Sequence, residues 1–130
     1  MSTSTLDPAV KHQAFADACN AGDVGGLLAL YSPDAIVVER TGELTRGIAA
    51  IRQHLEQLVA MNPRMEIIAS TAIVNGDVAQ LSSWWRCIVT TPDGREVELE
   101  FRGSELDRRQ PDGSWLIAVD NPWGAEAGLG

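Results

Sequence analysis

Two kinds of hydrophobic spacing divide the chain near residue 65. Before this point apolar residues recur every three or four positions, which is typical of helices with one buried face. After it they alternate with polar residues, which is typical of strands with one buried face. We therefore expect three helices in the N-terminal half, with one short strand over residues 35–39 between the second and the third, and a sheet in the C-terminal half.

Capping residues and chain breakers set the ends of the predicted helices. Asp7-Pro8 can start the first helix, because an acid caps the free amides and proline fits the first helical position. Asp23 can cap a short second helix in the same way. The clearest amphipathic pattern covers residues 48–59 and stops at Asn62-Pro63. The apolar stripe of the first helix comprises Val10, Ala14, Phe15, Ala18 and Cys19, and that of the second comprises Leu27, Leu28 and Tyr31.

Four strands are predicted over residues 65–74, 77–91, 95–109 and 114–122. The breaks between them contain Asn-Gly or Pro-Asp-Gly, turn sequences that join neighbouring strands as antiparallel hairpins. In the third strand Val97, Leu99 and Phe101 alternate with charged residues, so one face should be apolar. Leu106 falls out of this phase, which indicates a β-bulge at Gly103.

The second strand of this sheet is apolar on both faces. Trp85, Cys87 and Val89 fall on one face, whereas Val78, Trp84 and Ile88 fall on the other. Because a strand with two apolar faces must be covered on both, we expect helices against one face and a partner subunit against the other.

Composition narrows the classes of function. The 130 residues form one predicted domain over residues 1–124, followed by a flexible, glycine-containing tail over 125–130. A net charge of −8 repels phosphate backbones and anionic lipid, so we expect neither nucleic acid nor membrane as a partner. No apolar run is long enough for a membrane span and no signal peptide is present, so a cytoplasmic location is expected. Cys19 and Cys87 lack the spacing of a zinc or disulfide framework and are interpreted as buried thiols.

Several short segments resemble the nuclear-transport-factor-2-like superfamily, which includes ketosteroid isomerases and SnoaL-like polyketide cyclases. The first is Asn20-Ala-Gly-Asp23, followed by Leu28-Ala-Leu-Tyr31, Pro33-Asp-Ala35 and Gly47-Ile-Ala-Ala-Ile51. The ending from Asp112 to Gly124 looks like that of small bacterial members. The resemblance covers residues 8–124 and implies an α+β cone: a curved antiparallel sheet wrapped with three N-terminal helices around an interior pocket. Members commonly form homodimers through the outer sheet face.

The resemblance to ketosteroid isomerases implies an incomplete catalytic set. Glu39 matches the position of the catalytic base, at the end of the first short strand. The tyrosine that donates to the substrate oxygen is replaced by Phe15, which has no hydroxyl. A second donor, a protonated acid, would fall on the third sheet strand, where only Glu105 can serve. Loss of one oxyanion donor costs about 3–4 kcal/mol of transition-state stabilisation, so steroid isomerisation is not expected.

Each remaining candidate has both a functional and a structural interpretation. Glu39 either acts as a base or pairs with Arg40, Arg46 or Arg86 at the rim. Trp85 and Arg86 either offer a ring and a cation to a ligand, or pack in the core and pair with a glutamate on the next strand. Residues near the end of the last strand either reach the pocket or, in the case of Asn121, make the turn that closes the strand; they are Asp120, Asn121 and Trp123.

No further chemistry is indicated by the remaining motifs. His12 and His54 lie at the edges of their helical stripes and are interpreted as surface residues. No phosphate-binding loop, calcium loop or zinc-protease motif is present, so no cofactor and no metal are predicted. The hypothesis is a small-molecule pocket protein, with an isomerase, cyclase or dehydratase step on a partly apolar carbonyl compound and Glu39 as the base. The alternatives are a non-catalytic ligand-binding protein or a dimeric assembly module of the same fold.

Overall fold

The computed structural model describes residue 8 and residues 10–124. Two helices, α1 (Val10–Asn20) and α2 (Val24–Leu28), precede two strands, β1 (Tyr31–Val38) and β2 (Leu44–Arg46). Helix α3 (Ile48–Ala60) leads into four further strands: β3 (Arg64–Asn75), β4 (Val78–Thr90), β5 (Glu96–Arg109) and β6 (Trp115–Asn121). This order confirms the predicted division into a helical half and a sheet half. The predicted cap at Asp7 and the predicted tail over 125–130 lie outside the described residues.

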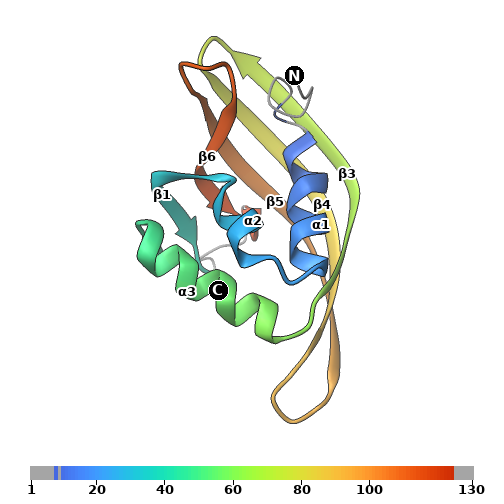
Figure 1. Ribbon diagram of the computed structural model, residues 1–130. Helices are drawn as coiled ribbons and strands as arrows, with labels where there is room; N and C mark the ends of the chain where they lie inside the picture. The colour runs from blue at the N-terminus through green and yellow to red at the C-terminus, as the bar shows by residue number, and fades with distance from the viewer. Residues whose placement is uncertain (1–7, 9, 125–130) are drawn as a thin grey trace.

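All six strands form one curved, open sheet in the order β2-β1-β6-β5-β4-β3 (Figure 1). The strands from β3 to β6 follow one another as antiparallel hairpins, as their turn sequences predicted. Strand β1 joins β6 in parallel, so the sheet is mixed and not wholly antiparallel. This pairing brings the first strand of the chain beside the last one, with Val37 opposite Asp120.

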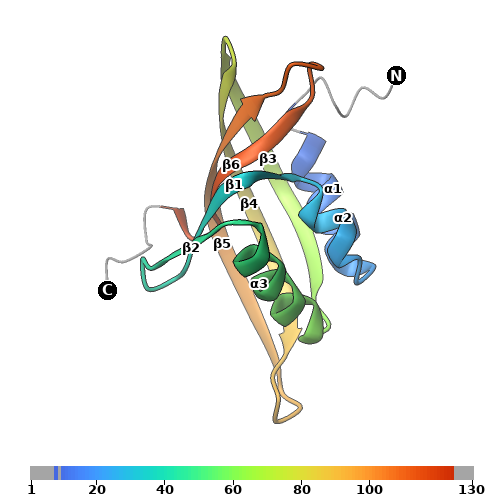
Figure 2. The same cartoon turned by 60° about the vertical axis from the view of Figure 1, so that its left-hand side comes forward.

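The three helices lie on the concave face of the sheet (Figure 2). Helix α1 packs on β3, and α3 packs on β1 and β2. The main core forms where these helices meet the sheet, and its fully buried members include Leu27, Val37, Ile51, Leu55 and Ile117. Burial of a leucine or isoleucine side chain contributes about 1.5–3 kcal/mol, so this cluster holds the helices over the concave face.

The buried face of α1 differs from the predicted apolar stripe. Its buried residues are Lys11, His12, Ala16 and Cys19, whereas Val10 is exposed. Lys11 and His12 point inward because each meets an acidic side chain on β5. The spacing of hydrophobic residues along the sequence gives no information about such partners.

The segment around Pro33 also differs from the prediction. Tyr31 begins β1 and does not end α2, and β2 was predicted to be a loop. Pro33 has no amide proton and falls where the pairing with β6 shifts register, between Tyr31 and Ile36, so the strand tolerates it. The predicted cap of α2 is confirmed, because the Asp23 carboxylate accepts a hydrogen bond from the Gly26 amide at 2.9 Å.

The predicted β-bulge at Gly103 is wrong. The β4–β5 ladder runs without interruption from Val78–Arg108 to Thr90–Glu96, and the irregularity of β5 lies against β6, between Leu106 and Asp107. Alternation is kept, but the polarity of the faces inverts: Glu105 and Asp107 are buried on the inner face, while Leu106 lies outside with 39% exposure. The inner face changes from apolar to acidic at Gly103.

The outer face of β4 carries apolar side chains, as predicted: Trp84 and Ile88 are only partly buried there. Cys19 and Cys87 are both free and buried, which confirms their interpretation as buried thiols. Burial raises the pKa of Cys19 to about 12, so this thiol is unreactive at neutral pH. None of the helices in the described part of the chain has the length and apolar character to cross a bilayer.

Candidate active site

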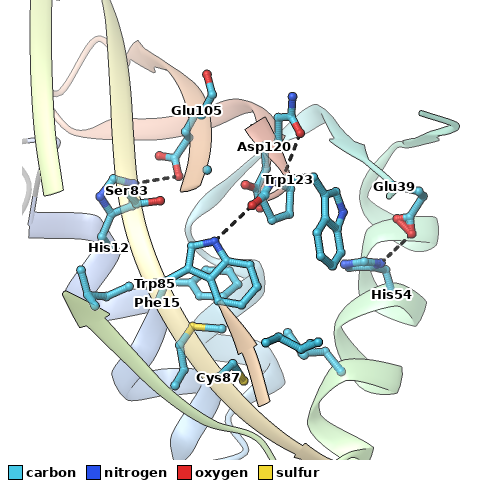
Figure 3. Close-up of a pocket in the computed structure, with 18 of the residues that line it drawn as sticks. His12, Phe15, Glu39, His54, Ser83, Trp85, Cys87, Glu105, Asp120 and Trp123 are labelled. Atoms are coloured by element: carbon cyan, nitrogen blue, oxygen red, sulfur yellow. Dashed lines mark hydrogen bonds and ion pairs between the residues drawn. The ribbon is translucent and has the colours of Figure 1, made fainter. Parts of the chain in front are cut away.

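A cavity of about 290 Å³ lies between the helices and the concave face of the sheet (Figure 3). Helices α1 and α3 and strands β1, β3, β4, β5 and β6 all contribute to it. This volume lies close to the lower end of the range for small-molecule sites in proteins, about 300–1,000 Å³. The cavity therefore suits a small organic molecule.

Aromatic and aliphatic side chains form one part of the wall. The ring of Trp85 lies 5.3 Å from that of Phe101 and 6.1 Å from that of Trp123, measured between centroids. The Trp85 indole N–H donates to the carbonyl oxygen of Pro122 at 3.1 Å, so the ring is fixed in orientation. Other apolar side chains that line the cavity are Phe15, Leu58, Met61, Met65, Ile67, Val89 and Leu99.

Glu39 and His54 form the first polar pair of the cavity. Glu39 follows the last residue of β1, and His54 projects from α3, with 3.1 Å between Glu39 Oε1 and His54 Nδ1. The side chains are 31% and 30% exposed, so the pair meets both the cavity and solvent. The second carboxylate oxygen, Oε2, is buried and has no hydrogen-bond partner among the described residues. An unpaired carboxylate oxygen in a cavity can accept a proton or a hydrogen bond from a ligand.

Glu105 and His12 form a second polar pair, away from the first. Figure 3 shows them on the other side of the cavity from Glu39 and His54, with Trp85 and Trp123 between. His12 Nε2 lies 3.6 Å from Glu105 Oε1, and both side chains are more than nine-tenths buried. Glu105 Oε2 is also buried, without a hydrogen-bond partner among the described residues.

Burial sets the protonation of this second pair. It raises the pKa of the Glu105 carboxyl well above 4.5, and the neighbouring carboxyls of Asp107 and Asp120 raise it further. Burial also lowers the pKa of His12 below 6.5, partly offset by Asp107. Burial therefore favours the protonated form of Glu105, which can donate, and the uncharged form of the His12 imidazole.

Tyr31 and Asp120 form a third contact between β1 and β6. The Tyr31 hydroxyl donates to Asp120 Oδ2 at 2.6 Å. Burial raises the pKa of Asp120, while this hydrogen bond and the nearby His54 lower it. His54 thus acts electrostatically on both Glu39 and Asp120, and links the polar groups along the cavity.

A buried ion pair lies next to Glu105, at the polar part of the cavity. Lys11 Nζ lies 2.9 Å from Asp107 Oδ2 and donates to the Trp115 carbonyl oxygen at 3.0 Å. The Lys11 and Asp107 side chains are 5% and 0% exposed. The lysine offsets one of the clustered acids, so the remaining ones can stay buried.

Seven of the eight site residues predicted from the sequence line the cavity: Phe15, Glu39, Trp85, Glu105, Asp120, Asn121 and Trp123. Asn121 also fills its structural role, since its side chain accepts from the Trp123 amide and donates to the Gly124 carbonyl.

Arg86 does not reach the cavity, and this candidate is corrected. It lies between two inward-facing residues of β4 and so points outward, where its guanidinium is 2.7 Å from Glu66 and 3.7 Å from Glu98. Alternation along the strand decides this, because Trp85 faces in. The interpretation as a cross-strand ion pair is confirmed.

The two histidines were predicted to be on the surface, and both line the cavity instead. His12 lies three positions before Phe15 and His54 lies between Ile51 and Leu58, so each shares a helix face with apolar residues. That spacing is the signal that could have placed them inside. Tyr31 also lines the cavity; it was predicted to face inward, but from the second helix and not from β1. Ser83, a further lining residue, carried no comparable signal in the sequence.

The lining is acidic in its chemistry. Within the described residues it includes three carboxyl groups, from Glu39, Glu105 and Asp120, and neither a lysine nor an arginine. No group of three or more histidine, cysteine, aspartate or glutamate side chains in the described part of the chain is arranged to hold a metal ion. Such a wall disfavours anionic ligands and accepts neutral ones that supply hydrogen-bonding groups.

Comparison with protein families gives one match: the model of the SnoaL-like domain aligns with residues 12–116. Comparison with curated protein sequences gives no match.

Solved structures with the same fold come from many bacteria. A nuclear-transport-factor-2-like superfamily protein of Salmonella enterica has a TM-score of 0.79 at 17% identity, over 98% of this chain and 97% of that one. A proposed dehydratase of that family from Streptomyces avermitilis has a TM-score of 0.77 at 16% identity, covering 92% and 94%. A proposed ketosteroid isomerase from Shewanella frigidimarina has a TM-score of 0.75 at 18% identity, covering 90% and 93%. At these identities the likeness shows the fold.

Proposed function

Because the chain belongs to the SnoaL-like domain family of the nuclear-transport-factor-2-like superfamily, we propose that its cavity carries out acid–base chemistry on a small, neutral carbonyl compound. One solved neighbour is named as a proposed ketosteroid isomerase and another as a proposed dehydratase. Isomerisation of a ketone and loss of water from a hydroxy ketone can both begin with removal of a proton from the carbon next to the carbonyl group. The proposal rests on the side chains of this cavity, since a fold of this kind hosts many functions.

One observation carries the proposal: two carboxyl–imidazole pairs in different surroundings share one cavity. Glu39, beside His54, is partly exposed and has one oxygen without a partner among the described residues. Glu105, beside His12, is buried, and burial raises the pKa of its carboxyl and favours the protonated form. Groups whose environments separate their protonation states are suited to act as base and acid in the same reaction.

In this reaction Glu39 removes a proton from the carbon next to the substrate carbonyl. Negative charge then develops on the carbonyl oxygen, or on a leaving hydroxyl, and the neutral Glu105 carboxyl donates a hydrogen bond or a proton to it. Glu105 thus supplies the second donor of the ketosteroid isomerase pattern, whereas the first is missing because position 15 is a phenylalanine. Phe15 and Trp85 hold the apolar part of the substrate.

Size and charge indicate the class of substrate. A cavity of about 290 Å³ lies at the lower end of the range for small-molecule sites and favours a one- or two-ring compound. The carboxyl groups of the lining disfavour carboxylates and phosphates. We therefore expect a neutral ring compound with a carbonyl group and, for a dehydration, a hydroxyl two carbons from it.

Two simple probes test this function with one readout. Cyclohex-3-enone gives cyclohex-2-enone by isomerisation, and 3-hydroxycyclohexanone gives the same conjugated ketone by loss of water, so its ultraviolet absorption reports either reaction. We expect Glu39→Gln to lower kcat/KM at least a hundredfold, because a general base contributes about 10²–10⁴-fold. Glu43→Gln is the matched control, since Glu43 lies in the same loop, is exposed and does not line the cavity.

Equal turnover by the wild type and Glu39→Gln would remove Glu39 as the base. A probe that raises the melting temperature without being converted would instead support the non-catalytic binding alternative, since a ligand that binds the native state stabilises it by RT ln(1 + [L]/Kd).

A further inference from the structure

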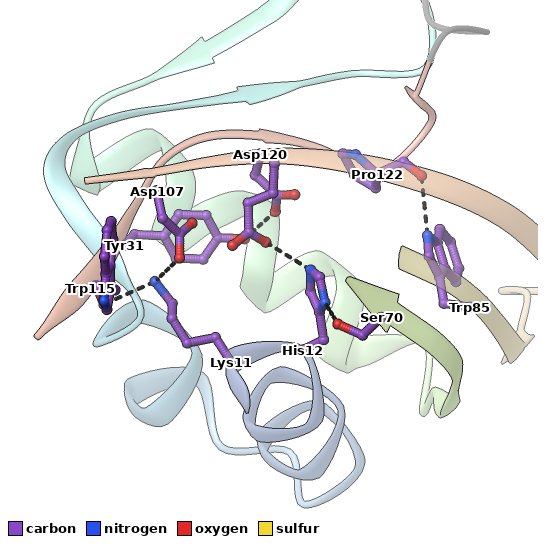
Figure 4. A network of polar contacts seen from close by, with 10 residues as sticks. Lys11, His12, Tyr31, Ser70, Trp85, Asp107, Trp115, Asp120 and Pro122 are labelled. Atoms are coloured by element: carbon purple, nitrogen blue, oxygen red, sulfur yellow. Dashed lines mark hydrogen bonds and ion pairs between the residues drawn. The ribbon is translucent and has the colours of Figure 1, made fainter. Parts of the chain in front are cut away.

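His12 contacts Glu105 at the wall of the cavity and has a second partner of its own. Its Nε2 faces Glu105 Oε1 at 3.6 Å, and its Nδ1 is hydrogen-bonded to the hydroxyl of Ser70 on β3 (Figure 4). Ser70 belongs to the strand at one edge of the sheet and is only partly buried. The three side chains thus form a line from the cavity, through a buried ring, toward solvent at the β3 edge.

Each member of this line is a group that can pass a proton. The Glu105 carboxyl and the Ser70 hydroxyl can each give and accept one, and a neutral imidazole accepts at one nitrogen while it donates at the other. The contact between Nε2 and Oε1 is slightly longer than a hydrogen bond, which is common for catalytic contacts in the absence of ligand. Burial of His12 favours the uncharged ring that such a shuttle uses.

We propose that Ser70 and His12 form a proton relay that resupplies Glu105 from solvent at the edge of the sheet, independently of the mouth of the cavity. The relay deepens the proposed function and rests on it for the step that removes the proton from Glu105. His12 and Ser70 are positioning and relay groups in this proposal, since neither is required to touch the reacting atoms.

The need for a relay depends on the reaction. In a dehydration Glu39 takes the proton from carbon, the C–O bond breaks as the C=C bond forms, and the Glu105 proton leaves with the hydroxyl as water. Glu39 then holds an extra proton, which it releases to solvent, and Glu105 lacks one. In an isomerisation the proton taken by Glu39 returns to another carbon of the substrate, and Glu105 need not lose its own. The relay therefore favours the elimination of water from a hydroxy carbonyl compound.

The proton balance of the relay is complete without a further reactant. The Glu105 carboxylate accepts the proton of His12 Nε2, Nδ1 accepts the proton of the Ser70 hydroxyl, and Ser70 takes one from water. The hydroxide that remains is neutralised by the proton that Glu39 releases. A half-turn of the imidazole about its Cβ–Cγ bond then brings Nδ1–H to the side of Glu105 for the next transfer, and the proton stays on Nδ1 during this turn.

Charged and titratable groups from four elements face Glu105. Lys11 and His12 come from α1, Asp107 from β5 and Asp120 from β6, and Tyr31 of β1 donates to Asp120. Among these contacts of the described residues, the one made by His12 leads on to a hydroxyl at the edge of the sheet, whereas Lys11 is held by Asp107 and the Trp115 carbonyl.

Hydrogen exchange at the Glu105 carboxyl tests the relay without any ligand. The intact protein is mixed rapidly with D₂O, and infrared spectroscopy follows the carbonyl band of the protonated carboxyl as it shifts on deuteration. Glu105→Gln identifies the band by its loss. We expect Ser70→Ala and His12→Gln to slow this exchange at least tenfold, whereas Ser70→Thr, which keeps the hydroxyl, restores the rate.

Ser83→Ala is the matched control, because Ser83 lines the cavity and is the direct partner of Ser70 on β4. Equal exchange rates in the wild type, Ser70→Ala and Ser83→Ala would overturn the relay, since cavity water would then supply the proton. A spectrum without a band that depends on Glu105 would overturn it as well. Ser70→Ala, a small change at a partly buried residue, decides the outcome where His12→Gln fails to fold. This readout does not use turnover, so its failure is distinct from a failure of the proposed function.

Discussion

Glu105 and Asp107 lie two residues apart on the inner face of β5, and only Asp107 has a lysine beside it. The Lys11–Asp107 pair is fully enclosed, so its attraction is little screened by solvent. Among the described residues Glu105 forms no ion pair with a lysine or an arginine, and burial favours its protonated form. The position of the one lysine thus gives the two carboxyl groups different surroundings.

The raised pKa of Glu105 makes stability depend on pH in a defined direction. The folded protein keeps this proton at pH values where the unfolded chain, with a pKa near 4.5, has lost it. The stability that Glu105 contributes is therefore complete below pH 4.5 and is lost as pH rises toward the pKa of the folded protein. We expect Glu105→Gln and the wild type to have nearly the same free energy of unfolding at pH 4. At pH 7 the wild type has lost part of the contribution of Glu105, so Glu105→Gln should be the more stable of the two proteins.

Urea unfolding at the two pH values measures this difference, and Glu56→Gln, at an exposed position of α3, is the control. If the difference between Glu105→Gln and the wild type is independent of pH, Glu105 is ionised in the folded protein and cannot act as the donor.

At the scale of the elements, close approach of strands fixes the polar end of the cavity. Gly103 lies where β5 passes β4 and the end of β6: a Cβ atom there would be 2.9 Å from Ser83 Oγ and 3.3 Å from the Pro122 carbonyl oxygen. The glycine thus keeps β5 in register, so that Glu105 and Asp107 face inward beyond it. The backbone of Gly103 is not at a positive φ, so space, not strain, selects the glycine.

Two glycine-to-alanine substitutions should therefore have opposite effects. We expect Gly103→Ala to destabilise the protein by about 1–3 kcal/mol through overpacking. Gly25→Ala, in α2, places its methyl group 3.6 Å from the Asp23 carboxylate, an ordinary contact, and should stabilise by about 0.4–1 kcal/mol through the lower entropy of the unfolded chain. Thermal unfolding measures both, and a neutral Gly103→Ala would contradict the packing argument.

At the scale of the whole molecule, the three helices of the described residues lie on the concave face of the sheet, and none of them lies on the outer face (Figure 2). A row of paired positions crosses this outer face, with Ile73 opposite Gln80 and Gln80 opposite Leu106. Ile73 is 69% exposed and Leu106 is 39% exposed, next to the charged part of the face around Arg86. We propose that a second copy of the chain covers this row, as expected for an apolar sheet face that has no helix on it.

Sedimentation velocity at micromolar concentration tests this association. The wild type should sediment with twice the mass of the 14.0 kDa chain, and Leu106→Lys should shift it to the single chain, because the new charge would be buried at the interface. Leu44→Lys is the control, since Leu44 is 48% exposed but lies on β2. A wild type that sediments as a single chain would remove the proposal.

The sequence was sufficient to predict most elements and much of the site. The strands from β3 to β6 were predicted to within a few residues, because glycine-containing turns and alternation act over short distances. Glu39, Glu105 and Asp120 were identified from a family resemblance and from their places at strand ends, and all three line the cavity. The prediction for Arg86 was wrong because it was grouped with Trp85, although adjacent residues of a strand face opposite sides; by alternation Arg86 belongs to the outer face with Trp84 and Ile88.

Local patterning by itself determined the helices, the hairpins and the apolar half of the cavity, since these depend on residues a few positions apart. Only the tertiary structure decided that His12 and Lys11 point inward. The acids that stabilise these side chains when they are buried lie on β5, nearly a hundred residues away. It also decided the contacts of His12 with Ser70 and of Tyr31 with Asp120, which are 58 and 89 residues apart in the sequence. The free energy of a buried polar group depends on its partner, and for these groups the fold alone supplies the partner.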